Sequence, residues 1–120
     1  MIKHFNVDAE YDYSFDIFTM TVKDDFNFGR SIELEDGVIL DFDENYIPIS
    51  IEILDISERL SISKHEMQNS TASMQIIINE DILSVHIEFK YIVHENEFNE
   101  TINSKIANNY NIPNMELALA

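Results

Sequence analysis

The 120-residue chain has no cysteine, no tryptophan, and only two glycines and two prolines. Without cysteine it can form no disulfide and no thiolate metal site, which agrees with a reducing compartment, and we expect a cytoplasmic protein. Two glycines are too few for a phosphate-cradling loop, and the sequence contains no G-x-S-x-G segment for a nucleophilic serine. No run of apolar residues approaches the roughly 18 of a membrane-spanning helix, and the N-terminal residues predict no signal peptide.

Basic residues are also scarce, because 23 aspartates and glutamates face 7 lysines and arginines, for a net charge of -16. A nucleic-acid-binding protein needs a basic surface to displace counterions from phosphates, and an anionic membrane would repel this chain. The charge therefore excludes nucleic acid and membrane as partners. It leaves a basic protein, a divalent cation, or no partner for a protein that the charge merely keeps in solution.

Apolar and polar residues alternate along much of the chain, which is typical of half-buried β-strands. The alternation is clearest from Ser31 to Leu60, where Asp36-Gly37 is a strong hairpin signal; a bulge within one longer strand is the alternative. We predict a mainly β fold, an antiparallel sheet of about seven or eight short strands with one or two short helices; an α+β arrangement is the alternative. The expected strands lie near residues 3–13, 17–23, 31–35, 38–43, 48–54, 74–78, 83–93 and 115–119.

Two short helices are predicted between these strands. Asp55 is a suitable N-cap for a helix over residues 56–60, with Glu58 at the third position of a capping box. Two isoleucines at an i, i+4 spacing predict a second helix over residues 100–110. The polar stretch 61–73 is predicted to be a linker.

We predict that the chain has two parts. Residues 1–60 form one β domain, and residues 61–120 form a C-terminal β extension that packs on it or completes the same fold, because neither half alone has much core. The apolar tail at residues 115–120 can pack on its own sheet, pair with a symmetric copy, or serve as a handle for a protease that binds apolar C-termini. The second possibility makes a homo-oligomer one expectation.

The sequence of residues 33–43 and 51–60 resembles a small prokaryotic family described only as a domain of unknown function, number 2283. The aromatic and acidic residues at 11–13 and the strand that follows also fit its opening. The resemblance covers roughly residues 10–60 and implies a compact, mostly antiparallel β domain, with no activity attached. Tyr46 departs from it, because members of that family often carry glycine in this turn.

One local pattern matches a calcium-binding loop. Asp41, Asp43 and Asn45, with Glu52 eleven residues after Asp41, occupy positions 1, 3, 5 and 12 of an EF-hand, where hard oxygens surround the ion. The glycine needed at position 6 is replaced by Tyr46, and the flanking residues predict strands rather than helices. A looser cation site is a second possibility, drawn from the clustered acids Asp36, Asp41, Asp43 and Glu44. The competing interpretation is an acidic hairpin that faces water.

No catalytic constellation is visible, because acids this abundant form pairs by chance and the four histidines lack ligand spacing. We therefore expect that the protein is not an enzyme and that it binds no cofactor other than, as one possibility, calcium. Our leading hypothesis is a non-catalytic acidic module that binds a basic protein, and the alternative is a divalent-cation-binding domain that uses the carboxylates of residues 36–52. The candidate interaction residues are Glu33, Glu35, Asp36 and Glu44.

Overall fold

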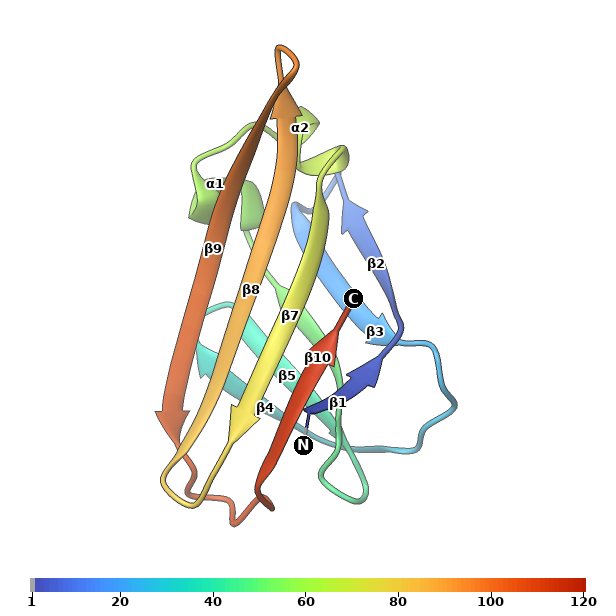
Figure 1. The fold of residues 1–120 in the computed structure, drawn as a ribbon, viewed down its shortest axis with the longest axis vertical. Helices are drawn as coiled ribbons and strands as arrows, with labels where there is room; N and C mark the ends of the chain where they lie inside the picture. Colours follow the sequence, from blue (N-terminus) through green and yellow to red (C-terminus); the bar gives the residue numbers. More distant parts are fainter. Residues whose placement is uncertain (1) are drawn as a thin grey trace.

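The computed structural model describes residues 2–120 as two five-stranded sheets packed face to face (Figure 1). We name them the N-terminal sheet, ordered β2-β3-β6-β5-β4, and the C-terminal sheet, ordered β1-β10-β7-β8-β9. The first contains β2 (Val7–Asp12), β3 (Ile17–Val22), β4 (Phe28–Glu35), β5 (Val38–Asp43) and β6 (Pro48–Ile53). The second contains β1 (Ile2–Phe5), β7 (Thr71–Ile78), β8 (Ile82–Val93), β9 (Asn96–Ala107) and β10 (Met115–Leu119). The predicted mainly β, antiparallel architecture is confirmed, with more strands than expected.

Two short helices, α1 (Ile56–Leu60) and α2 (Lys64–Gln68), join the sheets at one end of the molecule (Figure 1). Helix α1 lies where the capping pattern predicts it. Within residues 2–120 no helix is long and apolar enough to cross a membrane.

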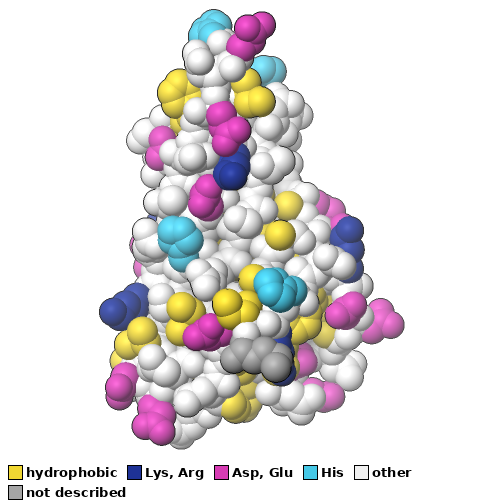
Figure 2. Space-filling view, viewed as in Figure 1, with side chains coloured by type: hydrophobic (Ala, Val, Ile, Leu, Met, Phe, Trp, Pro, Cys, Tyr) yellow, Lys and Arg dark blue, Asp and Glu magenta, His cyan; other side chains and the backbone are white. Residues whose placement is uncertain are grey.

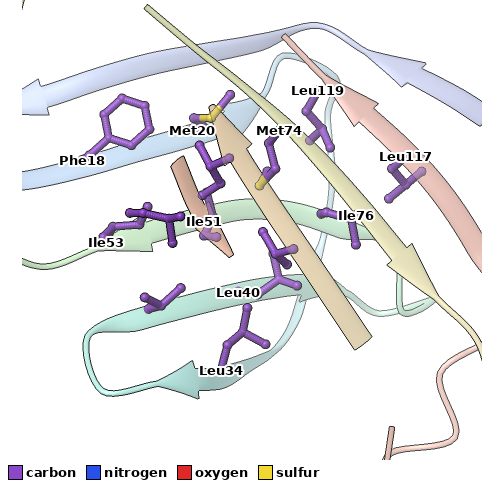
Figure 3. Packing of buried hydrophobic residues seen from close by; sticks show 14 of the residues in the cluster. Phe18, Met20, Leu34, Leu40, Ile51, Ile53, Met74, Ile76, Leu117 and Leu119 are labelled. Carbon is purple, nitrogen blue, oxygen red and sulfur yellow. The ribbon is translucent and has the colours of Figure 1, made fainter. Parts of the chain in front are cut away.

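The core lies between the sheets and forms from the inward half of each alternating strand. Figure 3 shows side chains of both sheets meeting there, with Met20 and Ile51 from the N-terminal sheet and Met74 from the C-terminal sheet. Phe18 and Phe89 pack edge to face across the layers, with ring centroids 5.0 Å apart. Each sheet therefore supplies the apolar cover that the other lacks.

The β4–β5 and β5–β6 connections follow the turn chemistry of the sequence. Gly37 lies in the predicted hairpin with φ of 82°, a conformation that residues with a Cβ rarely adopt. Tyr46 has φ of 61° in the next turn, which explains why glycine suits this position in the resembling family.

The segment predicted as one strand over residues 3–13 is in fact two strands in different sheets. β1 pairs in parallel with β10, and β2 pairs with β3, so the chain passes from one sheet to the other at Asn6. The carbonyl of Asn6 accepts a hydrogen bond from Lys23 N at 3.0 Å. Strand β10 lies between β1 and β7, so the apolar tail packs on its own sheet, which is the first of the three possibilities predicted for it.

The helix predicted over residues 100–110 is wrong, because most of this segment is β9, paired along its whole length with β8. Ile102 and Ile106 are an even number of residues apart, so they share a face on a strand as well as on a helix. The predicted linker at 61–73 is also wrong. It contains α2, whose N-cap Ser63 accepts a hydrogen bond from Glu66 N at 3.0 Å, and the buried Met67.

Candidate functional site

The outward side chains of the N-terminal sheet form one continuous acidic surface. Residues opposite each other in antiparallel strands share a face, so the strand register identifies this set. Its carboxylates come from four of the five strands and are Asp8, Glu10, Asp12, Glu33, Asp41 and Glu52. The other members are short or neutral: Ile17, Thr19, Thr21, Ser31, Ile39 and Ser50. We call this surface the acidic face. None of these outward strand positions carries Lys or Arg, and Lys23, directly after β3, lies 3.8 Å from Asp8.

The carboxylates of the acidic face are spaced rather than clustered. One row across the sheet reads Glu10, Thr19, Glu52, Ile39 and Glu33, so a neutral residue separates each pair of acids. Adjacent strands lie about 4.8 Å apart, which puts the backbones that carry successive acids of this row about 10 Å from each other. This spacing limits repulsion between the acids, and it suits several separate cations better than one shared ion.

A shallow hollow lies on this face where β2, β3 and β6 adjoin. Its lining consists of Glu10, Tyr11, Asp12, Ile17, Thr19 and Glu52. Three carboxylates, those of Glu10, Asp12 and Glu52, thus line this hollow. A basic side chain entering it would find acceptors on two strands.

The four calcium candidates do not converge on one point. Asp41 lies on the acidic face, where its carboxylate accepts hydrogen bonds from Ser31 and Ser50 on the flanking strands. Asp43 Oδ1 accepts instead from the backbone of its own turn, at 2.8 Å from Asn45 N. Glu52 is on β6 opposite Ile39, two residue pairs along from Asp41.

Within residues 2–120, no group of three or more His, Asp or Glu side chains is placed to hold a metal ion. Asp41 already accepts hydrogen bonds from the two flanking strands, and Asp43 accepts from the backbone of the β5–β6 turn. The calcium hypothesis therefore stays a prediction, and this arrangement does not favour it.

Of the four candidate interaction residues, one lies on the acidic face and three lie at the turns that form its rim. Glu33 belongs to the acidic face, whereas Glu35 and Asp36 lie at the β4–β5 hairpin beside Arg59. The guanidinium of Arg59 is 3.4 Å from Glu35 Oε2 and also donates to the carbonyl of Asp36. Glu44 lies in the β5–β6 turn and accepts from Asn27 at 3.3 Å. Arg59 therefore offsets part of the charge at the rim.

Three acids of the face, Asp8, Glu10 and Asp12, are absent from the candidates drawn from the sequence. The signal that identifies them is the strict alternation in Val7–Asp12, which places all three on one side of β2. That alternation alone does not reveal that β2 shares a face with Glu33 and Glu52.

A buried carboxylate holds the end of the N-terminal sheet to α1. Asp16 is 7% exposed and accepts from the Tyr11 hydroxyl at 2.8 Å, from Ser57 Oγ at 2.7 Å and from Ser57 N at 3.1 Å. Burial, and then the hydrogen bond and negative charge of Asp16, raise the pKa of Tyr11 above its usual value. The predicted N-cap Asp55 makes no side-chain cap, so Asp16 takes that role from a distant part of the chain.

The outer face of the C-terminal sheet has a different character. Figure 2 looks onto it and shows basic, acidic and histidine side chains interspersed among many neutral ones. Lys90 lies 3.8 Å from Glu88 on β8, and His86 on the same strand contacts Asn103 of β9. Carboxylates thus outnumber basic side chains more strongly on the outer face of the N-terminal sheet than on the outer face of the C-terminal sheet.

A comparison with known proteins finds a family that is similar to part of the chain. Residues 9–57 match the family described as a protein of unknown function, DUF2283. The resemblance seen in the sequence is confirmed over this segment, which spans nearly all of β2 to β6 and the start of α1. No curated protein and no solved structure matches the chain. The DUF2283 segment thus contains most of the acidic face, while the C-terminal sheet lies largely outside it.

Proposed function

We propose that the chain is a non-catalytic interaction module whose acidic face binds a basic protein. One observation carries this proposal: the outward positions of the N-terminal sheet have carboxylates on four strands and no Lys or Arg. Charge of one sign on one face steers a partner of opposite charge and raises the association rate. A uniformly acidic surface that only maintained solubility would not require this difference between the two sheets.

The chemistry of the face also supports a protein rather than an ion as the partner. The strands that carry successive acids of one row are about 10 Å apart, and among residues 2–120 no three acids or histidines are placed to hold a metal ion. Separate lysine or arginine side chains on a folded surface can match such a spacing. Asp41 is held between Ser31 and Ser50, so its carboxylate needs little ordering when a partner binds.

A binding titration with a lysine-rich peptide tests the proposal. The face variant replaces three glutamates by glutamine: Glu10→Gln, Glu33→Gln and Glu52→Gln. The control removes the same charge at exposed positions elsewhere: Glu80→Gln, Glu95→Gln and Glu116→Gln. Both variants change the net charge by three, so they differ only in where the charge is lost.

We expect the face variant to bind the peptide roughly tenfold more weakly than the control does, because each exposed ion pair contributes a few tenths to about 1 kcal/mol. The affinity of the unmodified chain should fall as salt is added, since surface charges are screened. Equal losses in the two variants would mean that net charge alone attracts the peptide, and the proposal would be wrong.

A further inference from the structure

The C-terminal sheet ends in a long strand whose outer edge has no partner. β9 contains 12 residues, and Figure 1 shows it as the edge of its sheet, opposite β1. Its register with β8 runs without a break from Asn96 to Ala107. Among residues 2–120, no backbone hydrogen bond joins this edge to another element, apart from a local turn from Asn109 N to Ala107 O.

The other three edges of the two sheets are protected from pairing. β1 has only 4 residues, and β4 has register shifts at two places. β2 carries Asp8, Glu10 and Asp12, which would repel a second copy of the same strand. Short strands, bulges and edge charges of one sign are the usual protection against edge-to-edge contact. β9 has neither a bulge nor a proline, so its row of backbone donors and acceptors is open.

We propose that β9 pairs with β9 of a second copy of this chain, antiparallel and around a two-fold axis at Thr101. In this register Glu97 of each copy lies opposite Lys105 of the other, Asn99 lies opposite Asn103, and Thr101 lies opposite itself. The two sheets then join into one continuous sheet. Each dimer contains the Glu97–Lys105 pair twice, because the interface is symmetric.

The register is selected by charge and by the faces of the strand. A continuous sheet requires outward residues to oppose outward residues, and Glu97 and Lys105 both point outward in the pairing of β9 with β8. Of the registers that meet this condition, only the one centred on Thr101 sets these two opposite charges against each other. Thr–Thr and opposite-charge pairs are favourable across antiparallel strands.

The inward side of β9 gains cover in the same arrangement. Phe98 is 45% exposed although it stacks on Tyr91, with ring centroids 5.8 Å apart. In the dimer it lies opposite Ser104 of the second copy and diagonal to that copy's Ile102 and Ile106, within reach of an aromatic ring. Pairing would therefore remove apolar surface from water.

The surroundings of β9 carry little of the charge that would oppose self-association. β8 and β9 together hold three acids and two bases, Glu88, Glu97 and Glu100 against Lys90 and Lys105, a net of -1. The inward Glu100 accepts a hydrogen bond from Tyr91 at 3.4 Å. The proposed dimer and the acidic face use different surfaces, so each can fail without the other.

Sedimentation of the full chain across a wide range of protein concentration tests the dimer. We expect the mass to rise with concentration from 14.0 kDa towards twice that value. Glu97→Lys alone and Lys105→Glu alone each create two like-charge pairs and should raise the dissociation constant roughly tenfold. Mixing these two variants restores both opposite-charge pairs, and a heterodimer should form. The control Lys3→Glu makes the same charge change at β1 and should dimerise like the unmodified chain.

Disulfide trapping checks the register, because the chain has no cysteine of its own. Thr101→Cys should form a covalent dimer on oxidation, since opposed residues at the two-fold axis are within disulfide reach. Asn103→Cys should not, because its two copies would be offset by four residues, about 13 Å. A chain that stays monomeric at every concentration would overturn the proposal. So would a dimer that is indifferent to Lys105→Glu, or one that cross-links equally through both cysteines.

Discussion

The hydrogen bonds between Asp16 and Ser57 give a direct test of how the N-terminal sheet is joined to α1. Replacing Asp16 by alanine removes the acceptor of three hydrogen bonds, two of them from Ser57, which is itself 7% exposed. A buried hydrogen-bond donor that is left without an acceptor lowers the stability of the folded protein by about 1–3 kcal/mol. Asp16 also has φ of 56°, which aspartate and asparagine tolerate better than alanine.

We therefore expect Asp16→Ala to lower the free energy of unfolding by about 3 kcal/mol or more. Asp16→Asn keeps one acceptor oxygen and the tolerated φ, so its loss should be smaller, about 1–2 kcal/mol. Tyr11→Phe removes a single donor from a partly exposed site and should lose about 1 kcal/mol. Urea denaturation followed by circular dichroism measures all three changes.

A double-mutant cycle separates this network from general packing. Tyr11→Phe and Ser57→Ala act on the same carboxylate, so their combined effect should differ from the sum of the two by about 0.5 kcal/mol or more. A loss below about 1 kcal/mol for Asp16→Ala would refute the reasoning, since it would mean that α1 finds other partners at little cost.

Three further outcomes follow from the structure. The pKa of Tyr11 is raised in the folded chain, so above pH 10 the Tyr11 hydroxyl loses its proton more readily in the unfolded chain, and the free energy of unfolding should fall. Tyr11→Phe should make that fall smaller in a pH series of denaturant midpoints. Calcium should stabilise the chain no more than magnesium does in thermal melts at fixed ionic strength, because Asp41 already accepts from two serines; a calcium-specific rise in melting temperature that Asp41→Asn abolishes would restore the cation site. Gly29→Ala should lower the free energy of unfolding by about 1–3 kcal/mol in urea, because the new Cβ would collide with the backbone carbonyl of Asp43. An unchanged midpoint would contradict this packing.

Local patterns predicted those elements that depend only on neighbouring residues. The alternation in Val38–Asp43 and Pro48–Ile53 identifies two strands, since the two-residue period is a property of the extended backbone. The hairpin at Gly37 follows from the freedom of glycine at positive φ. Ile102 and Ile106 show the limit of this reasoning, because a spacing of four fits a helix and a strand equally, and only the pairing with β8 decides.

The candidate site shows the same division. The sequence by itself determined a strong acidic excess, strands with acids on alternate positions, and a DUF2283-like segment. Only the tertiary structure decided that β2, β4, β5 and β6 turn their acids to one common face, and that Asp16 reaches Ser57 across 41 residues. The physical reason is that strand order and register are set by long-range pairing and by burial between two sheets, which no local period encodes.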